Sequence, residues 1–187
     1  GHAYNPEALI EHQAQFDFYD GGGVDLTFLG MVQDDLEGNI NVTKFGNRVI
    51  GSGGFINISQ NAKKVVFCGT FTAGGLEVEI VDGQLKIIQE GKIKKFVEKV
   101  DQITYSGKFA RSINQPVLYV TERAVFSLES DGLTLLEIAS GLDLEKDILS
   151  QMGFKPKIAH NLKEMPAGIF RHKWGELCRI VDNGQQP

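Results

Sequence analysis

Glycine is the residue that most constrains how this sequence can fold. The 187 residues contain 22 glycines and only 5 prolines, and the glycines separate short apolar runs. Chains punctuated this densely favour many short elements joined by tight turns over a bundle of long helices. With 42% hydrophobic residues, the sequence can form one substantial core. We therefore predict a mixed α/β fold in a single domain over residues 1–187, with 165–187 as a peripheral tail.

The glycine cluster GSGG, residues 51–54, is the first candidate functional site. Gly51, Gly53 and Gly54 can adopt positive φ and carry no Cβ, so their backbone N–H groups could converge on an anion or a developing oxyanion. A tight turn between two packed elements explains the same residues equally. The cluster by itself leaves both interpretations open.

Short apolar or alternating runs predict the strands. Residues 24–31 and 65–68 have the length and the flanking glycines of strands, and the first is expected in the central sheet. Alternating segments on either side of Asp82-Gly83 indicate a β-hairpin. Three further strands are expected in the runs 116–122, 124–130 and 133–139. The tail from 154 onward has weak periodicity and is expected to pack on the surface.

Helices are predicted at two places, and a third segment is ambiguous. Asn5-Pro6-Glu7 is typical of a helix start, and the helix is expected to continue through His12. Acidic residues followed by apolar ones predict a short amphipathic helix over 143–152. The segment FINIS, residues 55–59, alternates as a strand does, although a glycine loop at an anion site more often leads into a helix.

Charge narrows the classes of partner. The net charge of −5 and the pI near 5.4 argue against nucleic-acid binding, which needs a basic face. A local cluster of lysines could still meet phosphates, or could be a solvated face. These lysines are Lys92, Lys94, Lys95 and Lys99. No apolar run is long enough to span a membrane and no signal peptide is evident, so a soluble cytoplasmic protein with no membrane partner is expected.

The remaining chemistry-bearing residues form no known catalytic motif. Cys68 and Cys178 lie far apart, and the four histidines lack metal-binding spacing, so no metal is expected. Cys68 lies within an apolar run and is predicted to fill the core. There is no nucleophile elbow and no phosphate-binding P-loop. The residues themselves predict only an α/β domain whose glycine loop can stabilise negative charge.

Three long segments resemble the C-terminal half of a family I CoA-transferase, of the fused acyl-CoA:acetate/propionate or 3-oxoacid type. They are FDFYDGGGVDLTFLGMVQ, GSGGFINISQNAKKVVFCGTFTAGG and VTERAVFSLESDGLTLLEIASGLDLEKDIL. The resemblance runs from about residue 5 to about residue 163, with the motifs in the family's order. It implies the open, layered α/β fold shared by CoA-transferases and sugar-phosphate isomerase-like proteins.

The resemblance also implies a reaction. CoA is exchanged between an acyl-CoA and a short-chain carboxylate through a thioester on an enzyme glutamate. In the family this glutamate lies in an E-x-G motif just upstream of the stretch seen here, and neither Glu7 nor Glu11 has that context. No catalytic residue is therefore assigned in this chain, which alone is expected to be inactive. The CoA thioester is a substrate, and no permanently bound cofactor is expected.

The resemblance assigns site residues as well. Gly51, Gly53, Gly54 and Phe55 would form the oxyanion and CoA-binding loop, and the segment after the loop would be helical. The other candidates are Gln13 and Gln15, possible polar contacts in the substrate pocket. The implied partners are the two substrates, the N-terminal half of the same enzyme and further copies in a homo-oligomer. A noncatalytic subunit paired with a separate α-type chain, or a binding domain without chemistry, are the alternatives.

Overall fold

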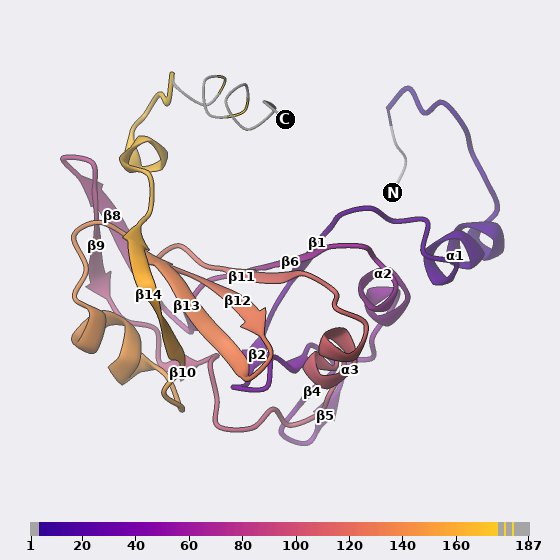
Figure 1. The fold of residues 1–187 in the computed structure, drawn as a ribbon, viewed down its shortest axis with the longest axis horizontal. Coiled ribbons are helices and arrows are strands. Elements are labelled where there is room, and N and C mark those ends of the chain that lie inside the picture. The colour runs from indigo at the N-terminus through magenta and orange to yellow at the C-terminus, as the bar shows by residue number, and fades with distance from the viewer. Residues whose placement is uncertain (1–3, 176–177, 179–180, 182–187) are drawn as a thin grey trace.

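The computed structural model describes residues 4–175, 178 and 181 and has a mixed α/β fold (Figure 1), which confirms the predicted class. Its centre is a six-stranded sheet in the order β1-β6-β11-β12-β13-β14. β1, β6 and β11 are parallel, β12 is antiparallel to β11 and β13, and β13 and β14 are parallel. The strands are β1 (Thr27–Gly30), β6 (Val65–Cys68), β11 (Val117–Val120), β12 (Ala124–Glu129), β13 (Gly132–Ile138) and β14 (Lys157–Glu164).

Smaller elements surround this sheet. The predicted hairpin is present, and its turn places Asp82 at φ 53° and Gly83 at φ 77°, as a two-residue turn between twisted strands requires. The short strands are β2 (Gln33–Asp34), β3 (Ile40–Asn41), β4 (Lys44–Phe45), β5 (Arg48–Val49), β7 (Thr72–Ala73), β8 (Glu77–Val81), β9 (Gln84–Gln89) and β10 (Ile93–Lys94). The helices are α1 (His12–Asp20), α2 (Phe55–Gln60), α3 (Gly107–Ser112), the π-helix η1 (Leu144–Ile148) and the 3-10 helices η2 (Leu149–Gln151) and η3 (Ala167–Phe170).

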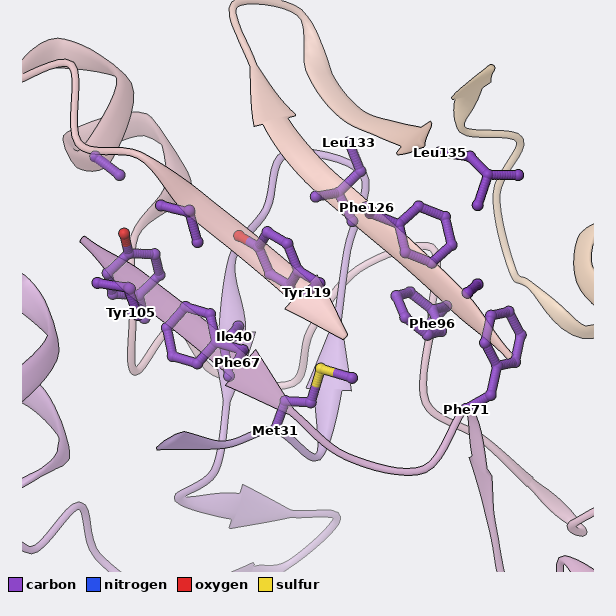
Figure 2. Close-up of a cluster of buried hydrophobic side chains, with 14 of the residues drawn as sticks. Met31, Ile40, Phe67, Phe71, Phe96, Tyr105, Tyr119, Phe126, Leu133 and Leu135 are labelled. Carbon is purple, nitrogen blue, oxygen red and sulfur yellow. The ribbon is translucent and has the colours of Figure 1, made fainter. Parts of the chain in front are cut away.

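The main core lies on one face of the central sheet and is rich in aromatic side chains (Figure 2). Phe67 of β6 and Tyr119 of β11 have ring centroids 5.5 Å apart. Phe126 of β12 lies 5.0 Å from Phe96, which in turn lies 4.7 Å from Phe71. Such offset aromatic contacts add to the free energy gained by burying the rings. The core thus joins the sheet to the loops that follow β6 and precede α3.

The expected helix over residues 5–12 is wrong. Asn5 has a φ of 50°, whereas an N-cap residue needs an extended backbone, and α1 begins only at His12 with Glu11 as its N-cap. The alternating Phe16 and Phe18 lie inside this helix. The start signal at Asn5-Pro6-Glu7 therefore lies several residues before the point where the helix begins.

The segment 55–59 is helical, so its strand-like alternation misled and the helix implied by the family resemblance is confirmed. In α2 the buried residues are Phe55 and Ser59, which are four positions apart and share one helix face. The Ser59 hydroxyl also donates to the Phe55 carbonyl at 2.7 Å. One helical turn buries these two side chains together.

Residues 157–164 of the predicted surface tail form β14 at the edge of the central sheet, a strand that the sequence did not predict. β14 is mostly exposed, so it needs no apolar alternation and was invisible to a periodicity argument. Met165 and Phe170 then pack into a second core cluster with Leu85 and Ala139. The peripheral tail over 165–187 stays a prediction, since most of 176–187 lies outside the described residues.

Candidate functional site

The glycine loop, defined here as residues 51–54, leads directly into α2. The far end of α2 is tied to the amino end of β11, because the Gln115 amide donates to the Ser59 carbonyl at 2.9 Å and to the Ala62 carbonyl at 2.5 Å. Phe55, directly after the loop, instead stacks on Phe67 with a centroid distance of 5.8 Å.

The backbone of the loop is held open. Gly51 and Gly53 have φ of 95° and 53°, and a Cβ added at either would meet no atom within 4 Å. The Phe55 amide donates to the Ser52 carbonyl at 3.1 Å, which closes the turn. The amides of Gly51, Gly53 and Gly54 donate no hydrogen bond to any residue that the structure describes. These amides are therefore free to bind an anionic or polarised oxygen.

Helix α1 lies beside the loop and α2 (Figure 1). The Phe16 ring is so close that a Cβ on Gly54 would lie 3.1 Å from it. The Asn57 amide donates to both oxygens of the Asp20 carboxylate, at 3.0 and 3.1 Å. The Asn61 amide also donates to the Asp20 carbonyl at 2.9 Å. Contacts at Phe16 and Asp20 therefore hold α1 against the loop and α2.

The two candidate glutamines belong to this docked helix but differ in their surroundings. Gln13 is exposed and its side chain has no hydrogen bond to a described residue. Gln15 is half-buried and donates to the Tyr19 hydroxyl one turn away. Both residues lie on the helix whose Phe16 contacts the loop. Their contact with substrate stays a prediction, as does the role of Phe55, whose ring is anchored in the core.

Cys68 is exposed rather than buried, so its predicted place in the core is wrong. Side chains alternate across β6, and Val65 and Phe67 take the core face, which leaves Val66 and Cys68 on the opposite face. Partial burial raises the pKa of the Cys68 thiol above its ordinary value. The distant lysines do not lower it, as the sequence predicted.

The lysine cluster is not a uniformly solvated face, because Lys95 is buried and only 5% exposed. Lys92, Lys94 and Lys99 are exposed, and their contact with phosphates stays a prediction. A Cβ on Gly69 would lie 2.6 Å from the Lys95 ammonium, so this position accepts only glycine without a shift of the lysine. Nearby, Asp34 is fully buried and neither carboxylate oxygen has a hydrogen-bond partner among the described residues. Burial raises the pKa of Asp34 to about 8, although the Lys95 charge opposes the shift. Burial likewise lowers the pKa of Lys95.

Arg123 forms a second buried charge cluster, which sequence reasoning missed. Its side chain is fully buried and grips the Glu90 carboxylate through two nitrogens at 2.7 and 3.1 Å. Its Nε donates to Glu122 at 2.7 Å, and Nη1 also donates to the Asp147 carbonyl at 3.0 Å. The guanidinium lies 4.9 Å from the centroid of the Phe71 ring. The signal in the sequence was the polar trio Thr-Glu-Arg between two apolar runs.

The cluster fixes loops that are far apart in sequence. Glu122 accepts from the Phe71 amide at 2.8 Å, and Glu90 accepts from the Thr72 hydroxyl. Burial raises the pKa of the Glu90 carboxyl, but the hydrogen bonds from Arg123 and Thr72 outweigh it and hold that pKa below its ordinary value. The cluster therefore holds a carboxylate charged and pins the segment after β6 to the turn between β11 and β12.

The described residues lack two further features. They contain no group of three or more histidine, cysteine, aspartate or glutamate residues that could hold a metal ion. Among them no helix has both the length and the apolar character to cross a membrane.

An α/β sheet with a glycine loop of free amides is an arrangement suited to acyl-transfer chemistry, and comparison with known proteins makes the class specific. No family model matches the chain. It is 53% identical over 186 residues to caffeate CoA-transferase of Acetobacterium woodii, covering 97% of this chain and 35% of that protein. It is 51% identical over 166 residues to acetate CoA-transferase YdiF of Escherichia coli K12, covering 89% of this chain and 31% of that protein.

Solved structures of CoA-transferases are similar to this chain as well. The apoenzyme of the acyl-CoA transferase YdiF from Escherichia coli O157:H7 superposes with a TM-score of 0.89 at 49% identity, over 91% of this chain and 33% of that one. The same enzyme has been solved as a thioester complex with CoA. Glutaconate CoA-transferase of Acidaminococcus fermentans, at 19% identity and a TM-score of 0.57 over 83% of this chain and 58% of that one, shares the fold alone.

The chain therefore matches part of these CoA-transferases, and its resemblance to family I is confirmed. It spans about a third of the length of the relatives it matches.

Proposed function

We propose that this chain is the C-terminal part of an enzyme that exchanges CoA between an acyl-CoA and a short-chain carboxylate. The observation that carries the proposal is the glycine loop, where the amides of Gly51, Gly53 and Gly54 have no partner among the described residues. Relatives about half identical in sequence are named as transferases of CoA to caffeate or acetate. We extend that activity to the intact protein.

In the proposed reaction an enzyme glutamate outside this chain attacks the acyl-CoA thioester. The CoA thiolate leaves, returns to the activated glutamyl carbonyl and forms a glutamyl-CoA thioester as the first carboxylate departs. A second carboxylate then reverses these steps and takes the CoA. Each attack on a carbonyl creates an oxyanion, and the free amides of the loop would donate hydrogen bonds to it. Adding a side chain to the loop should therefore slow turnover more than it weakens folding.

A matched pair of substitutions in the whole gene product tests the role of the loop. Gly53 and Gly83 both have positive φ, and a Cβ at either meets nothing within 4 Å, so alanine strains the two backbones alike. Gly53→Ala should lower kcat/KM by about tenfold or more, since one oxyanion donor is worth about a hundredfold or more. Gly83→Ala, at the tip of the β8–β9 hairpin, should leave kcat/KM within a factor of about two, because the hairpin is remote from the loop. Equal losses in both variants would reduce the loop to a turn.

The covalent intermediate has its own test. The whole gene product incubated with acyl-CoA should carry a CoA thioester that hydroxylamine releases, and mass spectrometry should place it on a glutamate outside residues 1–187. The 187-residue chain alone should neither form the adduct nor exchange CoA between acetyl-CoA and propionate. An adduct on a residue of this chain would contradict the assignment. We also propose that the intact enzyme is a cytoplasmic homo-oligomer.

A further inference from the structure

The face of the central sheet opposite the aromatic core is apolar and largely uncovered. Register places Phe28, Val66 and Leu118 side by side across β1, β6 and β11, with Cys68 beside Val120 in the next row. Phe28 is 66% exposed and Leu118 37% exposed. We call these five side chains the open face.

The open face is unusual for strands of this kind. Parallel strands are normally covered on both faces, because the crossover connections between them lay helices on each side. Here the buried residues of α2 and α3 both pack into the core on the other face. The β8–β9 hairpin and η3 cover the neighbouring part of the sheet, where Leu85 and Phe170 pack near Val125 of β12. Val78 and Ile80 of the hairpin share a pocket with Val120, which therefore lies at the border of the open face.

A hollow of about 800 Å³ lies on the open face, so the surface is shaped as well as apolar. Its lining includes the apolar residues Leu26, Val66 and Leu118 and the polar residues Lys64, Ser127 and Glu129. An apolar ridge of another element would fill it. A patch of this kind on a protein surface marks a site of association.

We propose that the open face binds an amphipathic helix from the part of the longer polypeptide that precedes residue 1. The relatives are about three times as long as the matched region, so a large amount of chain is available to supply the helix. β1 is the first strand of this chain and lies at an edge of the sheet, beside the open face. Successive elements of a chain usually pack next to one another. β14, the last strand, occupies the opposite edge, farthest from the open face.

The segment leading into α1 supports the same direction. Leu9 is 85% exposed and Ile10 59% exposed, although both precede a helix docked on the body of the protein. Exposed apolar residues in this segment and on the open face are both explained by preceding chain that packs on them. This inference requires only that the chain is part of a polypeptide about as long as its relatives. It does not depend on the proposed transfer chemistry.

Cys68 provides a built-in probe of the open face. In the whole gene product we expect its thiol to react with a maleimide at least about 100-fold more slowly than in the unfolded protein, because the docked helix would have to open before reaction. Cys178, which is exposed, is the reference thiol, and mass spectrometry of labelled peptides separates the two. In the 187-residue chain Cys68 should label readily. Labelling of Cys68 as fast as Cys178 in the whole gene product would overturn the proposal.

A pair of substitutions in the whole gene product supplies the second measurement. Phe28→Asp should lower the melting temperature by at least about 5 °C, or prevent folding, because it places a charge under the helix. Ile103→Asp is the matched control, since Ile103 is 55% exposed and lies in the loop before α3. Its melting temperature should change by less than about 2 °C. Equal shifts for the two variants would contradict the proposal.

The alternative occupant is a second copy of the chain. If the 187-residue chain dimerises and Cys68 becomes protected as its concentration rises, while it stays reactive in the whole gene product, the helix is excluded and self-association takes its place. Neither readout involves CoA. A protected Cys68 in an inactive protein would keep this inference and remove the proposed function, and an accessible Cys68 in an active enzyme would do the reverse.

Discussion

Around Arg123 all three guanidinium nitrogens have acceptors, whereas at the glycine loop three backbone amides have none among the described residues. The Arg123 cluster is buried and joins four segments of chain. The glycine loop is largely exposed and is held by one turn hydrogen bond and by the ring of Phe55. Saturated polar groups fix a scaffold, while free ones are available to a ligand. The Arg123 cluster therefore stabilises the fold, whereas the amides of the glycine loop remain available to bind a ligand.

The largest expected effect tests the scaffold side. Arg123→Ala should lower the free energy of unfolding by about 3–5 kcal/mol, because it leaves the carboxylates of Glu90 and Glu122 without their counter-charge. Guanidinium unfolding followed by circular dichroism measures this. The control is Lys63→Ala, which removes an exposed ion pair with Asp25 and should change the free energy by less than about 1 kcal/mol. Similar values for both variants would make the Arg123 cluster an ordinary surface feature.

Asp34 is the opposite case to Arg123. Its carboxyl group is buried like the guanidinium, but it has no hydrogen-bond partner among the described residues. Its pKa of about 8 in the folded protein exceeds the ordinary value, so the folded state holds a proton that the unfolded state has released. This stabilisation is complete below about pH 4 and is lost as the pH rises through about 8. Lys95 and Asp35 also face the carboxyl group.

Asp34→Asn should therefore flatten the fall in unfolding free energy between pH 5 and pH 8 by an amount on the order of 3 kcal/mol. Denaturant titrations at four pH values measure the slope for both proteins. The conservative replacement keeps the shape of the side chain, so a parallel slope in the variant would show that Asp34 does not hold the proton.

The sequence predicted elements whose side chains alternate or whose turns need special residues, such as β6 and the hairpin at Asp82-Gly83. Prediction from the sequence failed for the elements whose structure depends on contacts between residues far apart in the chain. β14 pairs with β13 through its backbone while its side chains remain mostly exposed, so no pattern marks it. The glycine loop was visible because glycine is required locally. The Arg123 cluster was not, because the residues that it joins lie up to 51 positions apart in the sequence.

A smaller effect is expected on the stability of the loop. Gly53→Ala should lower the free energy of unfolding by only about 1 kcal/mol, the strain of a left-handed alanine with no clash. Thermal unfolding of the 187-residue chain measures it, and Gly83→Ala should give the same value. A loss of several kcal/mol at Gly53 would mean that the loop is part of the scaffold, and the contrast with Arg123 would disappear.

The smallest stability effects, and the finest distinction, concern the two glutamines of α1. Alanine at either position should change the unfolding free energy by less than about 0.5 kcal/mol, because exposed helix positions contribute little. Their polar groups differ, however, since the Gln15 amide is bonded to Tyr19 while that of Gln13 has no partner among the described residues. If free groups are the ones that meet a ligand, Gln13→Ala in the whole gene product should raise the KM for acyl-CoA severalfold, as loss of one hydrogen bond of about 1 kcal/mol does. Gln15→Ala should leave the KM nearly unchanged, because its amide already has an acceptor. The reverse order would mean that Gln15 leaves Tyr19 when substrate binds, and unchanged KM values in both variants would reduce the two glutamines to the polar start of a helix.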